Sequence, residues 1–227
     1  MTHLLSIIIP VLDEASVIEQ ALERVRAAAP EAELVVADGG SRDGTPGLAA
    51  KHARVVISGR GRALQMNRGA RESSGQWLLF LHADTVPPRG LSAEIAEASR
   101  LGFDAGAFRL RIAGRHPLLP LLAWGANLRT RRRGIALGDQ GLFVRRDLFW
   151  RLGGFPHLAL MEDYAFALKL KRAGVRLYVS PLVVETSGRR WDELGFFRVW
   201  WRMRRYYLSY HWRGDTAALA RDYRDVR

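Results

Sequence analysis

Short apolar segments alternate with segments of helical spacing through the first hundred residues. This pattern predicts strands at residues 5–10, 33–37, 54–57 and 76–81, and helices at 14–28, 43–52, 61–73 and 90–100. Strands that alternate with helices form βαβ units and a parallel sheet. Strands that are apolar along their whole length fit a sheet covered on both faces. The sequence therefore predicts an α/β, Rossmann-like fold, with a mostly parallel sheet and helices on both faces.

The second half of the chain is less regular. Strands are predicted at 105–112, 142–145, 175–179 and 182–184, and helices at 162–173 and 192–212, the last as one long helix. Gly174 follows the first of these helices, where glycine commonly ends a helix. We see no repeat or flexible linker. We therefore predict a main domain at 1–191 and a basic, amphipathic helical extension at 192–227.

Charge is distributed unevenly along the 227 residues, whose formal net charge is +12. Residues 1–100 carry 11 Lys and Arg against 12 Asp and Glu, whereas residues 101–227 carry 24 against 11. The basic half indicates a negatively charged partner. The chain has no cysteine, which excludes disulfides, thiol catalysis and cysteine-bound zinc. No signal peptide or membrane-spanning run is recognisable, so we expect a cytoplasmic protein, with peripheral attachment to the inner face of the cell membrane as one expected location.

Residues 196–212, "FFRVWWRMRRYYLSYHW", suggest what that partner is. At helical spacing one face carries Arg198, Arg202, Arg205 and Ser209, and the opposite face carries Phe196, Trp200, Met203 and Tyr207. An arginine-rich aromatic helix suits an anionic membrane surface. The alternative is a helix packed on its own domain with a solvated arginine face. No nucleic-acid fold signature accompanies it, so nucleic acid is not expected.

Polar side chains follow three of the predicted apolar strands. Asp13 and Glu14 follow the first, Asp38 the second, and His82 and Asp84 the fourth. Ligands of open α/β sheets bind outside the carboxyl ends of the strands. One such residue could simply cap a helix, but three strand ends with carboxylates indicate one shared crevice.

Two further features suit an anionic ligand there. Arg60 and Arg62 lie at the start of the helix predicted at 61–73, and a helix N-terminus with arginines favours a diphosphate. The alternative is a solvated basic helix start. Asp84 in "HADT" offers the hard oxygen that Mg²⁺ or Mn²⁺ prefers, and such ions take their remaining ligands from phosphate and water. Asp84 is therefore the predicted metal ligand.

In order and spacing these motifs resemble those of the inverting glycosyltransferases of family 2, which have the GT-A fold and use nucleotide-sugar donors. Within this family the chain resembles a small bacterial subgroup. The resemblance runs from Ser6 to about Trp191. It rests on "SIIIPVLDE", "VADGGSRDGT", "LFLHADT" and "LGGFP" followed by "MEDYAFALKLKRAG". It implies that Asp163 is the general base, that Glu162 orients the loop or the acceptor, and that Asp38 contacts the donor base.

The resemblance assigns two binding sets. The expected nucleotide-sugar-binding residues are Pro10, Asp13, Glu14, Asp38, Arg60, Arg62, Asn67, His82, Ala83 and Asp84. The expected acceptor-binding residues are Gly138, Asp139, Gln140, Arg190 and Trp191. Structural alternatives remain: Glu162 and Asp163 could cap a helix, residues 138–149 could be a turn into a strand, and Arg190 and Trp191 could stack on the surface. His82 stands where the family has the first Asp of its metal motif, and "SGRRW" lacks the Gln of the processive enzymes.

The predicted function is metal-assisted, inverting transfer of a hexose-like sugar from a UDP- or GDP-type donor to an acceptor hydroxyl. One alternative is a nucleotidyltransferase of similar fold, which would transfer a nucleotide. Another is a degenerate transferase that acts as a membrane- or nucleic-acid-binding module. Products distinguish the first two, since only a glycosyltransferase releases a nucleoside diphosphate.

Overall fold

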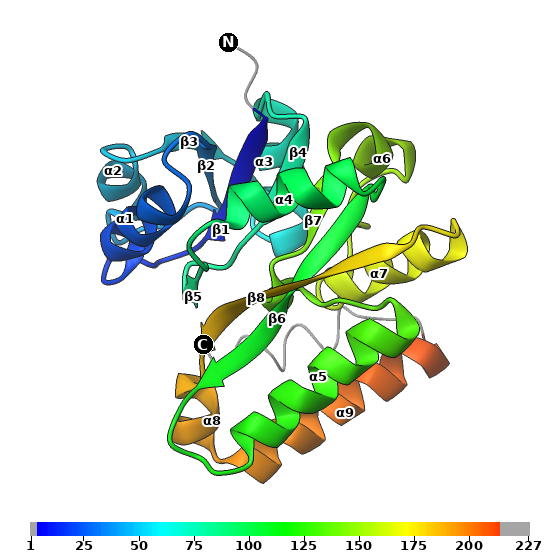
Figure 1. Cartoon of the computed structure of the whole chain (residues 1–227). Coiled ribbons are helices and arrows are strands. Elements are labelled where there is room, and N and C mark those ends of the chain that lie inside the picture. Colours follow the sequence, from blue (N-terminus) through cyan, green and yellow to red (C-terminus); the bar gives the residue numbers. More distant parts are fainter. Residues whose placement is uncertain (1–3, 214–227) are drawn as a thin grey trace.

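The computed structural model describes residues 4–213, whose strands form a single curved sheet (Figure 1). Its eight strands lie in the order β3-β2-β1-β4-β7-β6-β8-β5. Their bounds are β1 Leu5–Val11, β2 Glu33–Asp38, β3 Arg54–Ile57, β4 Trp77–Phe80, β5 Thr85–Val86, β6 Ala105–Ala113, β7 Phe143–Arg145 and β8 Leu177–Ser187. The four strands predicted in the first hundred residues form one contiguous parallel block, β3-β2-β1-β4.

Beyond β4 the sheet becomes mixed. Strand β7 runs antiparallel to both β4 and β6, β6 pairs in parallel with β8, and the short β5 is antiparallel to β8. The two strands predicted at 175–179 and 182–184 are wrong, because β8 is continuous through Pro181. The β6–β8 register shifts between Ala107 and Arg109, opposite this proline. An irregular register accommodates the missing N–H of proline, which would otherwise interrupt the strand.

Helices cover both faces of the sheet, which confirms the predicted fold class. The helical elements are α1 Ile18–Ala28, α2 Thr45–Ala49, α3 Arg62–Glu72, α4 Leu91–Arg100, α5 Leu119–Arg133, η1 Gly138–Gln140, α6 Arg146–Arg151, α7 Glu162–Arg172, α8 Arg189–Leu194 and α9 Phe196–Arg213. One apolar core packs α1 and α4 against the sheet through residues such as Leu22 and Ile95. A second core packs α3, α6 and α7 against the other face through Met66, Phe149 and Phe166.

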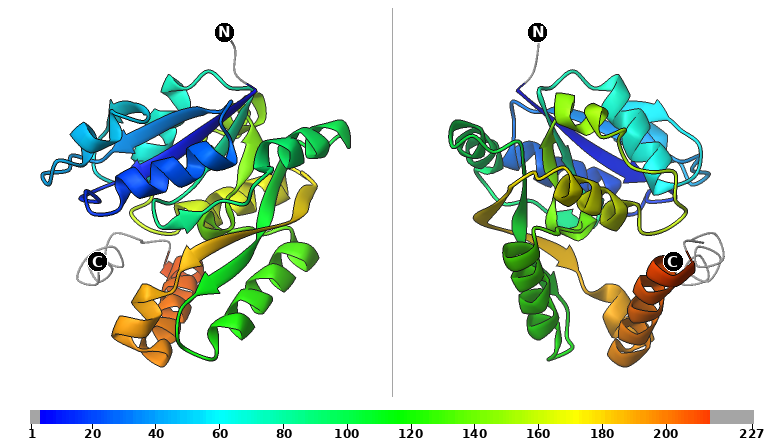
Figure 2. Two further views of the ribbon diagram at one scale, coloured as in Figure 1. Left: turned by 60° about the vertical axis from the view of Figure 1, so that its left-hand side comes forward. Right: turned by 90° about the vertical axis from the view of Figure 1, so that its right-hand side faces the viewer.

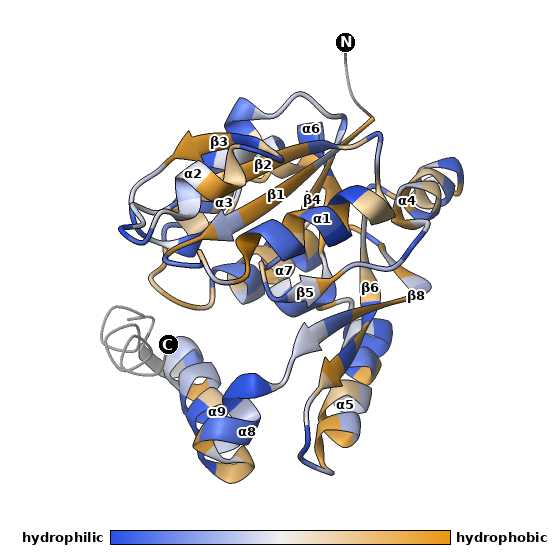
Figure 3. Ribbon diagram, turned by 90° about the vertical axis from the view of Figure 1, so that its left-hand side faces the viewer, coloured by the Kyte–Doolittle hydropathy of each residue, from blue (hydrophilic) through white to orange (hydrophobic). Residues whose placement is uncertain are grey.

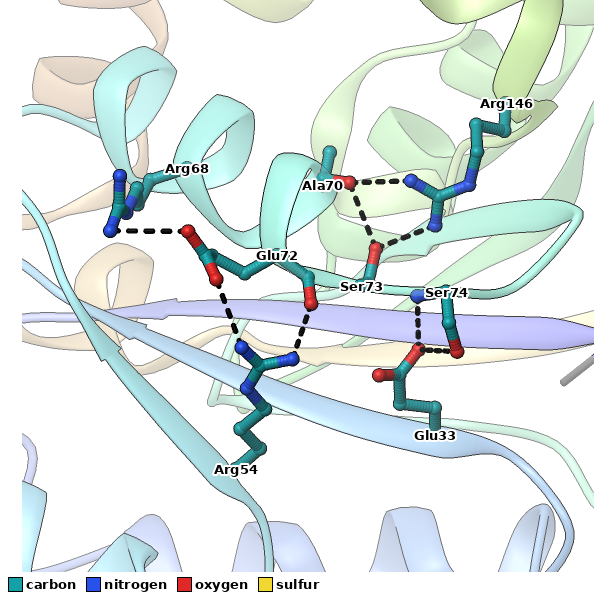
Figure 4. Close-up of polar contacts among 8 residues, drawn as sticks. All are labelled: Glu33, Arg54, Arg68, Ala70, Glu72, Ser73, Ser74 and Arg146. Carbon is teal, nitrogen blue, oxygen red and sulfur yellow. Dashed lines mark hydrogen bonds and ion pairs between the residues drawn. The ribbon is translucent and has the colours of Figure 1, made fainter. Parts of the chain in front are cut away.

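A polar cluster fixes the C-terminal end of α3 (Figure 4). Arg146 donates to the carbonyl oxygen of Ala70 at 2.7 Å and to the hydroxyl of Ser73 at 2.8 Å. Arg54 donates both to the backbone oxygen of Glu72, at 2.6 Å, and to its carboxylate, at 2.9 Å. Since α3 runs back from the carboxyl end of β3, fixing its last turn also fixes its first turn at the opposite edge of the sheet.

Strands β6 and β8 extend away from the rest of the sheet, and α5, α8 and α9 lie along this extension (Figure 2). Helix α5 was not predicted. Asn127 holds it to β6, because its side-chain amide accepts from the N–H of Leu110 at 2.8 Å and donates to the carbonyl of Leu110 at 3.0 Å. No helix within residues 4–213 combines the length and the apolar character needed to cross a membrane.

The single helix predicted at 192–212 is wrong, because Gly195 divides it into α8 and α9. Gly195 has a φ of 85°, a left-handed conformation that ends a helix readily only at glycine. The carboxylate of Asp192 accepts from the backbone N–H of Arg115 at 3.0 Å, and the rings of His116 and Phe196 stack at 4.6 Å. The predicted division at 191/192 falls inside α8, which these contacts tie to the entry of α5.

Candidate active site

The loops after β1 and β2 are joined to each other at the carboxyl edge of the sheet. Asp38 is buried, and its carboxylate accepts from the backbone N–H groups of Gly40 and Ser41 at 2.8 and 2.9 Å and from the Ser41 hydroxyl. Asp13, which has a φ of 53°, accepts from the N–H of Arg42 at 2.8 Å. The N–H of Glu14 donates to the Thr45 hydroxyl at 2.9 Å. The structure therefore brings together the first two predicted strand ends.

Sequence reasoning missed the residue that supports this edge from below. Gln65 of α3 is buried, and its Nε2 donates to the carbonyl oxygens of Val11 at 2.7 Å and Ala37 at 3.0 Å. A Cβ atom on Gly39 would lie only 3.0 Å from this side chain. A side chain at position 39 of the "VADGGSRDGT" motif would therefore press against Gln65. Gln65 gives no sequence signal, since its partners lie 28 and 54 residues away.

The end of β4 meets η1 and the start of α7. The N–H of Gly138 donates to Asp163 Oδ2 at 2.8 Å. A Cβ atom on Gly138 would lie 2.9 Å from His82 Nε2 and 3.2 Å from Asp163 Oδ2. His82 and Asp163 therefore converge on one point. A small cavity lies there, and its lining residues are Pro10, Met66, Phe80, Leu81, His82, Gly138, Leu142, Phe155, Glu162 and Asp163.

The two carboxylates that open α7 point in different directions, as expected for adjacent helical residues. Asp163 faces η1, whereas Glu162 is buried and its Oε1 accepts from Arg62 Nε at 2.6 Å. Burial raises the pKa of Glu162, and the charge of Arg62 opposes that shift. Arg62 begins α3, so this ion pair joins the predicted diphosphate-binding helix to the predicted catalytic helix across 100 residues of sequence.

The residues of η1 have different environments. One carboxylate oxygen of Asp139 is buried and has no hydrogen-bond partner in the described part of the chain. Burial raises the pKa of Asp139 to about 6, with a lowering effect from Arg129 and a further raising effect from Asp163. Gln140 is buried, and its Oε1 accepts from the Thr130 hydroxyl at 2.8 Å and from Arg129 at 3.1 Å. Gln140 thus fixes η1 to α5.

Four other predicted residues lie in settings that differ from the cavity. Asn67 uses both ends of its amide on the backbone of Phe155, at 2.8 and 3.0 Å. Arg60 is exposed in the loop before α3. Arg190 and Trp191 belong to α8, where the Trp191 ring lies 5.3 Å from that of Phe196. The two α8 residues therefore stand with the extension of the sheet.

A divalent cation fits this site only with help from substrate. Asp84 is exposed at the end of β4, beside His82 and Ala83. Within residues 4–213 no three His, Cys, Asp or Glu side chains come together in a way that could hold a metal. Mg²⁺ and similar hard cations often take one or two protein carboxylates and complete their shell with phosphate oxygens and water. Asp84 suits that mode of binding and does not suit a cage made wholly of protein ligands.

The curved α/β sheet, with polar residues at its carboxyl edge and a helix that opens with Glu162 and Asp163, defines a protein of the GT-A glycosyltransferase class. The sequence profile described as "Glycosyl transferase family 2" matches residues 6–144, more than half of the chain. The chain belongs to this family. The resemblance predicted from the sequence motifs is thereby confirmed.

Curated relatives are longer than this chain. A "Probable glycosyltransferase YdaM" of Bacillus subtilis is 24% identical over an alignment of 229 residues. The alignment covers 88% of this chain and 53% of the relative. A "PGL/p-HBAD biosynthesis glycosyltransferase" of Mycobacterium bovis is 41% identical over 88 residues, 35% of the chain and 34% of the relative. The chain thus spans about half of the first relative and about a third of the second.

Solved structures share the fold. A mannosyltransferase of Pyrobaculum calidifontis in complex with GDP-Man and Mn²⁺ has a TM-score of 0.66 and 22% identity, over 90% of this chain and 61% of that one. The glucosyl-3-phosphoglycerate synthase of Mycobacterium tuberculosis, in complex with Mn²⁺, UDP and phosphoglyceric acid, has a TM-score of 0.61 and 23% identity, over 85% and 74%. At these identities the likeness establishes the fold alone.

Proposed function

We propose that the chain is an inverting glycosyltransferase that moves a hexose from a nucleoside-diphosphate sugar to an acceptor hydroxyl. One observation carries this proposal. The carboxylate of Asp163 lies at the first turn of α7, beside a cavity lined by Pro10 near the end of β1 and His82 after β4, at the edge of the sheet where ligands of such folds bind. Membership of glycosyl transferase family 2 supports the same conclusion.

The proposed reaction is a single displacement. An acceptor hydroxyl is a poor nucleophile, so Asp163 takes its proton as the new bond forms. The acceptor oxygen attacks the anomeric carbon, and the bond from that carbon to the diphosphate oxygen breaks on the opposite face. The configuration inverts, and the nucleoside diphosphate leaves with the electron pair. Asp163 Oδ2 accepts from the N–H of Gly138 at 2.8 Å and Asp163 Oδ1 accepts from the N–H of Tyr164 at 2.7 Å, and these two bonds orient the carboxylate.

The donor is proposed to lie across the ends of β1, β2 and β4. Asp13, Glu14 and Asp38 are the proposed nucleoside contacts, and Arg60 and Arg62 at the start of α3 are the proposed diphosphate contacts. A Mg²⁺ or Mn²⁺ ion on Asp84 would stabilise the negative charge that develops on the leaving diphosphate. The GDP-Man, UDP and Mn²⁺ named for the two solved relatives support a donor of this type.

The acceptor is proposed to approach over η1. The buried oxygen of Asp139, which has no partner within the described part of the chain, suits a hydrogen-bond donor such as a second sugar hydroxyl. Arg190 and Trp191 remain proposed acceptor contacts from α8, at the outer side of the site. Peripheral attachment to an anionic membrane also remains a proposal.

Product analysis tests the proposed function. The full chain is incubated with UDP- and GDP-sugars and Mn²⁺, and release of nucleoside diphosphate is followed, first as slow donor hydrolysis and then with candidate acceptors. We expect nucleoside diphosphate and no pyrophosphate, and we expect Asp163→Asn to lower acceptor-dependent release about 10²–10⁴-fold while it retains nucleotide affinity. Pyrophosphate release would establish a nucleotidyltransferase. If the chain binds none of the nucleotide sugars, the result would favour a degenerate transferase.

A further inference from the structure

Helices α5 and α9 leave large apolar side chains in solvent. Leu121 and Trp124 of α5 are each 61% exposed, and Phe197 and Trp201 of α9 are 66% and 65% exposed. Leu208, further along α9, is 49% exposed. An isolated exposed apolar residue is ordinary, whereas several on one part of a surface mark a contact site.

The first turns of these two helices lie at the same end of the molecule. The stacked rings of His116 and Phe196 connect the residues just before α5 to the start of α9. Asp192 of α8 accepts from the N–H groups of both Arg115 and His116. Figure 3 shows apolar residues on the lower ends of both helices, away from the cores of the sheet. Leu121, Trp124, Phe197 and Trp201 therefore belong to the first two turns of two helices whose starts are held together, and we call these four residues the end face.

The end face differs from the apolar face predicted for residues 196–212. Phe196 and Tyr206 are buried at 8% and 1% exposure, and Tyr206 belongs to a small core with Leu160, joined by Met203. Of the predicted apolar face, Phe196 and Met203 thus pack on the domain, whereas Tyr207 is 41% exposed. Phe197, Trp201 and Leu208, at spacings of four and seven residues, lie on a different side of the helix, which residues 4–213 leave exposed.

The charge of α5 and α9 selects the partner. Together their sequences contain nine arginines and no Asp or Glu. Arg131, Arg132 and Arg133 are exposed on α5, and Arg198 and Arg204 are exposed on α9. A second copy of this chain would bring like charges together, so charge disfavours self-association through these helices. A surface of lipid phosphates complements the arginines, and its acyl boundary accepts the aromatic rings.

We propose that the end face docks the protein on an anionic lipid bilayer, with Trp124, Phe197 and Trp201 inserted at the level of the headgroups and the arginines on lipid phosphates. The docking surface involves none of the residues assigned to sugar transfer, so the membrane proposal can be tested separately from the proposed reaction. Its consequence is that both helices begin at the bilayer and run from it toward η1 and α7 (Figure 1).

Vesicle co-sedimentation of the full chain tests the proposal. Vesicles of phosphatidylcholine with phosphatidylglycerol are compared with phosphatidylcholine alone. We expect binding only to the anionic vesicles, weakened when salt rises from about 0.1 M to about 1 M and the Debye length falls from about 10 Å to about 3 Å. The double variant Trp124→Ser, Trp201→Ser should lower the partition coefficient about 10- to 100-fold, since two rings lose their apolar burial.

The matched control is Ile57→Ser, which removes an apolar side chain of 62% exposure from the edge strand β3 and should leave binding unchanged. Equal binding by the double variant and the natural chain would overturn the proposal, because charge alone would then explain the attachment. Absence of binding to anionic vesicles would also overturn it. Two other results would overturn it. In each, the double variant still binds lipid but loses another property of the natural chain, either dimerisation in sedimentation velocity or binding to single-stranded RNA.

Discussion

Replacing Asp139 with Asn should stabilise the protein at alkaline pH. One oxygen of the Asp139 carboxylate is buried and has no hydrogen-bond partner among residues 4–213, and burial raises the pKa of this group from 3.8 to about 6. Between these two values the native state binds more protons than the unfolded state, so stability falls as pH rises through this window. A shift of about two pKa units corresponds to about 3 kcal/mol, fully expressed above pH 6.

The net shift already contains the attraction of Arg129, so the figure refers to Asp139 in its present surroundings. Asn has nearly the same shape and does not titrate. We therefore expect Asp139→Asn to gain up to about 3 kcal/mol at pH 8, equivalent to about 6–12 °C in Tm for a domain of this size, and almost nothing near pH 4. Urea denaturation at both pH values, followed by far-UV circular dichroism, measures the difference.

The control is Glu97→Gln. The side chain of Glu97 is partly exposed, and its pKa is lowered by the hydrogen bonds from Arg100, so its replacement should give no gain in stability at either pH. If Asp139→Asn is no more stable than the natural chain at pH 8, then the ionised carboxylate of Asp139 does not destabilise the folded state. The site would then satisfy its carboxylate in solution, and the proposed acceptor contact would lose its physical basis.

Three further predictions concern the site itself. Asp163→Asn should lower the rate of single-turnover transfer by about 10²–10⁴-fold with nucleotide affinity unchanged, and Glu162→Gln should lower this rate less. Near-normal transfer by Asp163→Asn would mean that the two carboxylates only cap the helix. Asp84→Ala should fold normally and lose the gain in nucleoside-diphosphate affinity that Mn²⁺ gives, as calorimetry can show; an equal gain in the variant rejects the metal assignment. Gly138→Ala places a Cβ 2.9 Å from His82 Nε2 and 3.2 Å from Asp163 Oδ2. It should reduce turnover, and unchanged turnover would show that this loop does not position the base.

The part of the fold that could be predicted is the part built from local periodicity. Residues 7–9 and 34–37 are apolar throughout because both faces of β1 and β2 are covered, and that composition is visible in the sequence. The polar residues at the ends of these strands could be located for the same reason. The break at Gly195 was missed because residues on both sides have strong helical spacing, and only the φ of one glycine separates them.

What could not be predicted depends on contacts between distant segments. Arg62 and Glu162 are 100 residues apart, and either one alone is an ordinary polar residue at a helix start. Gln65 and Gln140 are polar residues in apolar surroundings, and only the tertiary structure supplies the carbonyl, hydroxyl and guanidinium groups that satisfy their oxygen or nitrogen. The sequence predicts which residues stand near the site, whereas packing determines which of them support it and which are free to bind substrate.

Tyr164 shows how the C-terminal helix and the proposed base share one support. It follows Asp163 on α7 and is buried, and its hydroxyl donates to that of Tyr207 at 3.2 Å and lies 3.0 Å from Nε2 of His211. Burial raises the pKa of Tyr164, so the hydroxyl stays protonated and keeps donating at neutral pH. Helix α9 therefore contacts the turn that carries Asp163 at one end and presents Phe197 and Trp201 at the other. If the end face lies on a bilayer, the same rigid helix fixes the distance and direction from that bilayer to the proposed base, a geometry suited to an acceptor hydroxyl presented at a membrane surface.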